Sequence, residues 1–164
     1  MKHALLCLCT AGTLLFGTQA ALAQSSAADA ITGVWETKSG GYVQIYRRGE
    51  VFAGRIVGSH DGKPRYDKNN PDKAKRDQRL LGQDILKGLQ YEGDKTYGGG
   101  TIYDPNNGKT YKAKAELTGP DTLDARGYIG VSLIGKTQTW HRIDPASEHV
   151  HAEALHKPVG TAAQ

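Results

Sequence analysis

The charged side chains most suited to binding a small molecule are two arginines on predicted β-strands. Arg55 shares a strand face with apolar residues, and Arg126 shares one with Asp124 and Tyr128. A guanidinium buried without a partner is very costly, so an arginine that points into a core must pair with an acid or bind an anion. Two interpretations stay open. In the first, Arg126 faces water, or the two arginines pair with Asp104 and Asp124. In the second, one of them binds the anionic head group of an amphiphile.

Aromatic residues with a polar tip are suited to line the cavity that such a ligand would occupy. Tyr and Trp combine a large apolar body with one hydrogen-bonding group, which is typical of small-molecule sites. On the predicted strands these residues are Tyr46, Tyr103, Tyr128 and Trp140. Together with Arg55 and Arg126 they form the candidate ligand-binding set.

The sequence carries no recognisable catalytic centre. A hydrolase needs a nucleophile, a base and a group that orients the base. Ser132 lies in Gly-Val-Ser-Leu-Ile-Gly, which is not a nucleophile elbow, and His141 has no obvious serine or aspartate partner. We therefore expect a non-enzymatic protein without a cofactor. A hydrolase remains an alternative that an esterase and glycosidase screen would test.

Two segments offer possible metal ligands. Residues 104–108 hold Asp and Asn oxygens but lack the other acidic positions and the closing Glu of an EF-hand, so we predict a turn there. His149, His151 and His156 near the C-terminus are suited only to weak binding of a transition metal. We predict no metal site, and whether the histidine-bearing tail binds metal stays open.

Residues 1–23 have the order of a secretory signal peptide. Lys2 and His3 precede an apolar, Leu-rich run from Ala4 to Phe16, and Ala21-Leu22-Ala23 predicts cleavage after Ala23. The apolar run is too short to span about 30 Å of hydrocarbon comfortably. We therefore expect an exported protein without a membrane anchor, either periplasmic or secreted.

Composition narrows the class of the mature chain. Both cysteines, Cys7 and Cys9, lie in the signal, so we expect no disulfide, thiolate nucleophile or zinc–thiolate site after cleavage. Removing Lys2 leaves 21 − 1 = 20 basic against 17 acidic residues, a net charge of +3. These charges are interleaved along the chain, which argues against a nucleic-acid partner.

Short strands and glycine-containing turns dominate the remaining sequence. In residues 110–117 apolar and polar side chains alternate, which is the period of a sheet with one dry face. The predicted strands are Gly33–Lys38, Gly41–Arg48, Val51–Gly58, Ile85–Tyr91, Thr96–Tyr103, Thr110–Leu117, Thr122–Ile129 and Ile134–Ile143. Because closure removes exposed edges, we predict an all-β fold, a single up-and-down antiparallel barrel of about eight strands. Such a barrel either fills with side chains or holds one small ligand.

Composition also predicts the domain order. Residues 24–32 are small and polar, which indicates a linker; residues 33–143 form the barrel; and residues 144–164 lack an apolar period, which indicates a flexible tail. One connection, residues 59–84, is long and charged, with helical character only from Pro71 to Arg79. Long connections of this kind are often functional or form a lid.

Several blocks along the barrel domain resemble one bacterial family. They are Gly33-Val34-Trp35-Glu36-Thr37, Gly54-Arg55-Ile56-Val57, Asp67-Lys68-Asn69-Asn70-Pro71-Asp72, the run from Gly99 to Tyr111, the run from Leu123 to Leu133, and Trp140-His141-Arg142. In this order, from Gly33 to Arg142, they resemble the exported family known as domain of unknown function 2147. The resemblance implies a secreted or periplasmic calycin-like (lipocalin-like) β-barrel, and no established reaction.

The lipocalin likeness implies a structural role for three residues. Lipocalins place a Gly-x-Trp on the first strand, where the Trp closes one end of the barrel, and a basic side chain near the last strand packs over its ring. Gly33, Trp35 and Arg142 match this pattern. A guanidinium over an indole face contributes about 0.5–2 kcal/mol.

These observations predict a binding protein that holds a small hydrophobic or amphipathic molecule in its barrel. An anionic amphiphile is one such ligand. The lipid-like nature of that ligand rests on analogy of fold. The alternative is an envelope interaction or stress-associated module whose barrel is filled by side chains. Such a module would act through its outer surface or through residues 59–84.

Overall fold

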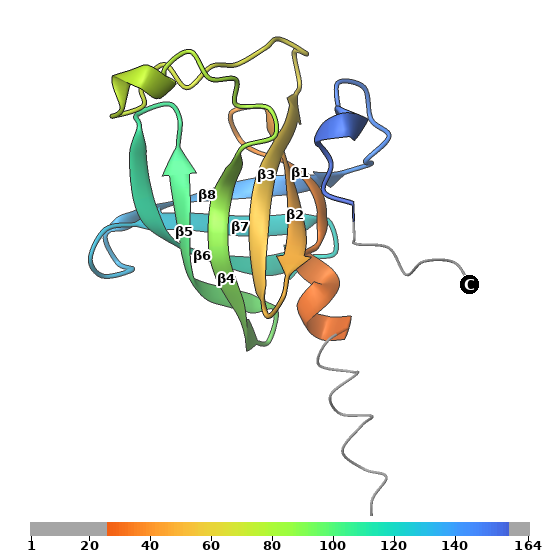
Figure 1. The fold of residues 1–164 in the computed structure, drawn as a ribbon. Coiled ribbons are helices and arrows are strands. Elements are labelled where there is room, and N and C mark those ends of the chain that lie inside the picture. The colour runs from red at the N-terminus through yellow and green to blue at the C-terminus, as the bar shows by residue number, and fades with distance from the viewer. Residues whose placement is uncertain (1–25, 158–164) are drawn as a thin grey trace, which may run out of the picture.

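Eight antiparallel strands pair in sequence order, and the last strand returns to the first (Figure 1). They are β1 Gly33–Glu36, β2 Gly41–Arg48, β3 Val51–Ser59, β4 Asp84–Gly93, β5 Thr96–Asp104, β6 Lys109–Gly119, β7 Thr122–Tyr128 and β8 Gly135–Ile143. Because β1 also pairs with β8, the barrel closes without a free edge, and the predicted up-and-down barrel is confirmed. The computed structural model describes residues 26–157, so the predicted signal peptide lies outside the described residues.

One end of the barrel is closed by the 3-10 helix η1, Asp29–Ile31, and the residues just before it. Ile31 and Ala28 are buried in the main core. The indole of Trp35 donates a hydrogen bond to the Ile31 carbonyl at 2.9 Å, and the Tyr97 hydroxyl donates one to the Ala28 carbonyl at 2.9 Å. The structure thus differs from the linker expected for residues 24–32, because part of that segment packs into the barrel end.

The opposite end carries the connections β1–β2, β3–β4, β5–β6 and β7–β8, since consecutive antiparallel strands alternate their ends. The longest of these, between β3 and β4, lies over this end of the barrel (Figure 1). Its helical character is limited to the 3-10 helix η2, Lys73–Lys75, which is shorter than the stretch from Pro71 to Arg79 that the sequence indicated. Buried Asp67 anchors the connection by accepting a hydrogen bond from the Tyr103 hydroxyl at 2.6 Å.

The described part of the C-terminal segment, residues 144–157, packs on the outer face of the first three strands. Val150 bridges Gly58, and Ala154 of the 3-10 helix η3, Ala152–Ala154, is buried in a second apolar cluster with Val57. The Gln44 side chain binds the backbone of His156 through both its amide and its carbonyl. This segment therefore differs from the flexible tail expected for residues 144–164. The few apolar residues of this segment show no regular spacing, but they pack against apolar residues on the outer face of the barrel.

Candidate ligand-binding cavity

The interior of the barrel is hollow. A cavity of about 520 Å³ opens toward the end covered by the β3–β4 connection, and its size lies within the roughly 300–1,000 Å³ of small-molecule sites. The space exists because the inward positions of β6 and β7 carry small side chains, namely Ala113, Ala115, Ala125 and Gly127. This finding disagrees with the alternative of a barrel filled by side chains.

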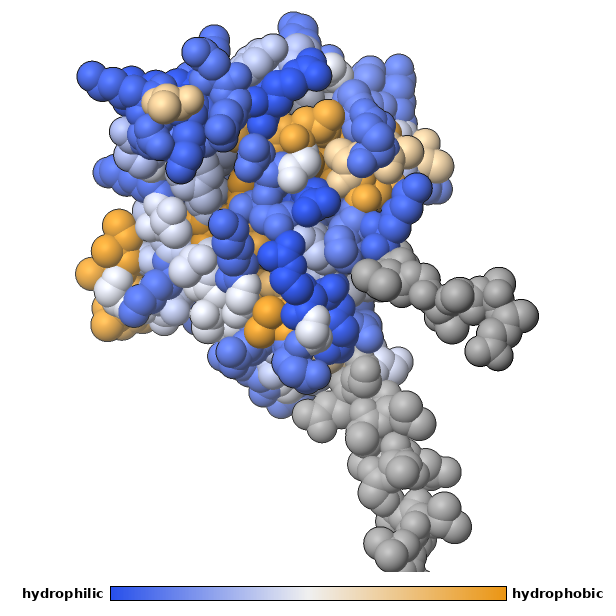
Figure 2. Space-filling view, in the orientation of Figure 1, coloured by the Kyte–Doolittle hydropathy of each residue, from blue (hydrophilic) through white to orange (hydrophobic). Residues whose placement is uncertain are grey.

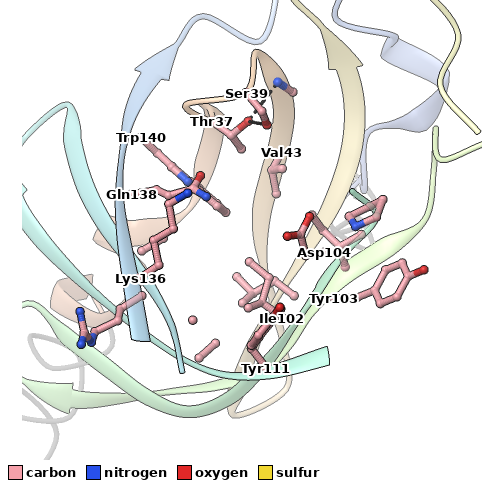
Figure 3. Close-up of a pocket in the computed structure, with 18 of the residues that line it drawn as sticks. Thr37, Ser39, Val43, Ile102, Tyr103, Asp104, Tyr111, Lys136, Gln138 and Trp140 are labelled. Atoms are coloured by element: carbon pink, nitrogen blue, oxygen red, sulfur yellow. Dashed lines mark hydrogen bonds between the residues drawn. The ribbon is translucent and has the colours of Figure 1, made fainter. Parts of the chain in front are cut away.

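The wall of the cavity formed by β2 to β5 is apolar. Successive inward positions of these strands carry branched aliphatic side chains, which line the space as Val43, Ile45, Ile56, Ile85, Leu86, Leu89 and Ile102. At the mouth the lining becomes polar, with Thr37, Ser39 and Asp104 (Figure 3). The cavity therefore has an apolar interior and a polar rim.

Strand β8 carries the polar groups that reach furthest into this cavity. Lys136, Gln138 and Trp140 alternate along the strand, so they leave the same face and line the cavity from its mouth inward (Figure 3). Lys136 is exposed at the mouth, and Gln138 is half-buried. Along these three residues the wall passes from a cation through an amide to an aromatic ring.

The indole nitrogen of Trp140 is the most unusual group in the cavity. The residue is 3% exposed, and its Nε1 has no hydrogen-bond partner among the residues that the structure describes. Leaving a buried donor unpaired costs about 1–3 kcal/mol, so such groups in native proteins call for a specific explanation. Trp140 lines the cavity, but its Nε1 is itself buried, so an acceptor held in the cavity would reach this N–H only after a small shift of the side chains around it.

The predicted ligand-binding residues divide into two groups. Tyr103, Arg126, Tyr128 and Trp140 line the cavity or its mouth, whereas Tyr46 and Arg55 do not. Tyr103 points away from the interior toward Asp67 (Figure 3), and burial together with this carboxylate raises the pKa of its hydroxyl to about 12. Of the predicted ligand-binding residues, only Trp140 both lines the cavity and is buried.

Arg126 lies at the cavity mouth but is engaged by its own chain. Its guanidinium donates hydrogen bonds to the carbonyl oxygens of Ser132 at 2.8 Å and Leu133 at 3.2 Å, and to Thr137 Oγ1 at 2.8 Å. Asp124, considered as its partner in the sequence, accepts instead from Thr139 Oγ1 at 2.7 Å. Arg126 therefore orders the connection between β7 and β8.

Tyr46 and Arg55 belong to an ionic cluster on the outside of the barrel, which corrects their predicted place in the ligand site. Arg55 Nε lies 2.9 Å from Asp84 Oδ1, Arg48 lies 2.6 Å from Asp84 Oδ2, and the Tyr46 hydroxyl donates to Asp84 at 3.0 Å. Burial alone would raise the pKa of Asp84, but these hydrogen bonds hold it below its ordinary value. The misplacement arose because the outer face of β3 also carries buried apolar residues such as Val57, which the C-terminal segment covers.

The three residues of the lipocalin-like plug meet at the closed end. Arg142 lies over the Trp35 ring, with its central carbon 4.2 Å from the ring centroid. Gly33 has a φ of +134°, and a Cβ at this position would overlap the Arg142 guanidinium. The glycine is thus needed both for its backbone conformation and for the close approach of the arginine.

The histidines and acids of the described chain do not form a metal centre. Between residues 26 and 157 no group of three His, Cys, Asp or Glu side chains is placed to hold a metal ion. His149 lies against the His60 carbonyl, His151 against Glu153, and the His156 ring stacks on Tyr46. Asp104 accepts hydrogen bonds from Asn106 and Asn107, as expected of a turn.

Lys136 and Gln138 are the cavity residues that the sequence prediction missed. The signal that could have found them is the two-residue period from Trp140 back along the same strand. The small residues on β6 and β7 were also visible in the sequence, and their size indicates a hollow barrel.

Comparisons with known proteins agree with this architecture. Residues 33–142 match the model of a family described as "Uncharacterized protein conserved in bacteria (DUF2147)". The structure of HP1028 from Helicobacter pylori, described as belonging to the lipocalin family, is similar with a TM-score of 0.65 and 26% identity, over 70% of this chain and 83% of that chain. No curated protein is significantly similar. The chain therefore belongs to the bacterial family of domain of unknown function 2147, and its fold is that of a lipocalin-like barrel.

Proposed function

We propose that this protein binds a small amphipathic molecule inside its barrel. The apolar part of the ligand would pack against the aliphatic wall of β2 to β5, and an acceptor group would face β8. The observation that carries this proposal is the cavity of about 520 Å³, which has an aliphatic wall and is lined on β8 by Lys136, Gln138 and Trp140. In a low-dielectric site, a hydrogen bond from one of these polar side chains to a ligand would orient that ligand.

The charges that line the cavity favour an acidic ligand, because the four cations Arg65, Lys114, Arg126 and Lys136 outnumber the one carboxylate, Asp104. Lys136 lines the cavity on the same strand face as Trp140, and within residues 26–157 no carboxylate forms an ion pair with it. A carboxylate or phosphate on the ligand would accept charge-assisted hydrogen bonds from Lys136 and from the Gln138 amide. We therefore propose an anionic amphiphile, for which the two predicted arginines are not required.

The signal-peptide pattern of residues 1–23 supports a role outside the cytoplasm, in the periplasm or beyond the cell. The lipocalin-like fold supports a binding role rather than catalysis. Within residues 26–157 no helix has the length and apolarity needed to cross a bilayer.

The test is native mass spectrometry of residues 24–164 purified from an exporting bacterial host. This span contains every contact described above. We expect a bound mass that is lost on denaturation, or, for protein without cargo, saturable binding of 1-anilinonaphthalene-8-sulfonate as an anionic probe. Ala113→Phe, which narrows the cavity, should abolish both signals, and Tyr66→Phe, at a residue that does not line the cavity, should leave them unchanged. Probe binding that is absent in the parent protein or undiminished in Ala113→Phe would refute the proposal.

A further inference from the structure

The connection between β7 and β8 exposes an unusual group of apolar side chains. Ile129, Val131, Leu133 and Ile134 are 61%, 61%, 88% and 69% exposed, whereas Tyr66, at 41%, is the other large hydrophobic residue exposed in residues 26–157. Figure 2 shows an orange projection at the left edge of the molecule, where Figure 1 draws this connection. Apolar side chains gathered on one exposed tip mark a binding surface.

The tip is held in this conformation by hydrogen bonds. Ile129 N donates to Ile134 O at 3.2 Å, Ile134 N donates to Val131 O at 3.1 Å, and Gly130 takes a positive φ of +69°. The Arg126 guanidinium donates hydrogen bonds to the carbonyl oxygens of Ser132 and Leu133 within the same connection. The apolar side chains are therefore presented to solvent by an ordered turn.

Basic residues lie directly behind this apolar tip. At the end of β6 and β7 next to the tip, Lys112 is paired in register with Tyr128, and Lys114 with Arg126. Lys136 follows the tip on β8. Like charges directly opposite each other, as in Lys114 and Arg126, repel unless an anion lies between them.

Charge changes sign with distance from the tip. Glu116 is paired in register with Asp124 one row further along the same two strands. Among the described residues, Lys112, Lys114, Arg126 and Lys136 form no ion pair with a carboxylate. On these two strands the acids thus lie further from the tip than the cations, and the cations next to the tip are available to negative charge from outside.

We propose that residues 129–134 insert into the surface of a bilayer containing anionic lipids, with Lys112 and Lys114 contacting the head groups and the positive charges of Arg126 and Lys136 adding to the attraction. Apolar side chains that enter the interface and cations that contact anionic head groups together give reversible attachment. Ile129 and Ile134 also line the cavity mouth, so attachment turns the mouth toward the membrane. The lipid surface would then be the source or destination of the ligand; the attachment itself does not depend on ligand binding.

The experiment is flotation of residues 24–164 with vesicles of phosphatidylethanolamine and phosphatidylglycerol, compared with vesicles of phosphatidylcholine. We expect binding to the anionic vesicles that weakens as salt rises, because salt screens the head-group contacts. The double variant Val131→Asp/Leu133→Asp should bind them about tenfold more weakly, since both apolar contacts are lost and negative charge is added. Tyr66→Asp places one negative charge on an exposed aromatic outside the tip and should bind like the parent protein.

A second comparison separates attachment from ligand binding. Val131 and Leu133 do not line the cavity, so their double variant should still bind 1-anilinonaphthalene-8-sulfonate, whereas Ala113→Phe should float normally but not bind this probe. Undiminished flotation of the double variant, or equal binding to neutral vesicles, would overturn the membrane proposal. Light scattering that shows a dimer dissociated by Val131→Asp/Leu133→Asp would also overturn it, by assigning the tip to a second copy of the chain.

Discussion

Arg142 closes the barrel over Trp35 at the end opposite the cavity mouth. Its guanidinium stacks 4.2 Å from the centroid of the indole ring and donates hydrogen bonds to Thr32 O at 2.6 Å and Ala30 O at 2.8 Å. Burial lowers the pKa of this guanidinium. One side chain therefore ties the last strand to the segment that enters the first.

Replacing this arginine should destabilise the whole barrel. Arg142→Ala removes the stack and the hydrogen bonds to three carbonyl oxygens, those of Ala30, Thr32 and Pro120, so we expect the free energy of unfolding to fall by about 3 kcal/mol. Arg142→Lys should recover little of it, because an ammonium does not reproduce the forked contacts. Urea denaturation measures both effects. The control is Arg79→Ala, which removes an exposed arginine; a loss as large as that of Arg142→Ala would show that the plug contributes nothing particular.

Gly33 should depend on Arg142 in a way that a double-mutant cycle reveals. Gly33→Ala introduces a side chain at a φ of +134° and displaces the guanidinium, so we expect a loss of about 2–4 kcal/mol in unfolding free energy. In the Arg142→Ala background only the backbone strain remains, and the loss should be smaller by at least about 1 kcal/mol. Equal losses in both backgrounds would mean that the two residues are not coupled.

The barrel could be predicted from the sequence because its determinants are local. The alternation of apolar and polar side chains in residues 110–117 and the glycine-bearing turns predicted the strand positions closely. For β2 the predicted bounds are those of the structure. The packing of Ile31 and Ala154 could not be predicted in this way. Each lies in a short segment without an apolar period, and it becomes buried only because a distant surface accommodates it.

Asp84 should make stability depend on acid pH. Its pKa is depressed in the folded state, so its contribution is present above the ordinary carboxylate pKa and is lost as pH falls through the folded value. We expect Asp84→Asn to cost about 2 kcal/mol at pH 7. The difference from the parent should shrink below about pH 4, as the parent carboxylate becomes protonated. Urea midpoints from pH 7 to pH 3 measure this; Asp77→Asn, at an exposed position, should show no such pH-dependent difference.

The candidate site was less predictable than the fold, for a physical reason. The sequence assigned Tyr46 and Arg55 to the interior because their strand face carries buried apolar residues. In the structure that face is the outer one, and residues 144–157 and Asp84 cover it. When a strand is covered on both faces, both alternating sets of its side chains include apolar residues. The difference in polarity that would identify the inner face is then lost. On β8 the contrast persists, and Trp140 was identified while its neighbours at the same spacing were overlooked.

The hollow interior predicts an unusual tolerance of a larger side chain. Ala113 is buried but lines the cavity, so Ala113→Phe should place its ring in empty space and leave the free energy of unfolding unchanged or raised. Ala28 is also buried but belongs to the packed end of the barrel, where Ala28→Phe should cost about 1–3 kcal/mol through overpacking. Urea denaturation compares the two variants. A comparable loss in Ala113→Phe would mean that the cavity is closed in solution.

Trp140 provides a direct optical test of ligand contact. The chain has two tryptophans, and the other, Trp35, already donates its N–H to Ile31 at the closed end. In Trp35→Phe protein the fluorescence then comes from Trp140 alone, and binding of a fatty-acid carboxylate should shift or quench it. In Trp140→Phe protein the remaining signal should not respond, and affinity should fall about tenfold because one buried hydrogen bond is lost while the ring is retained. Unchanged affinity in Trp140→Phe, measured by calorimetry, would show that the indole N–H does not contact the ligand and that the acceptor group lies elsewhere in the cavity.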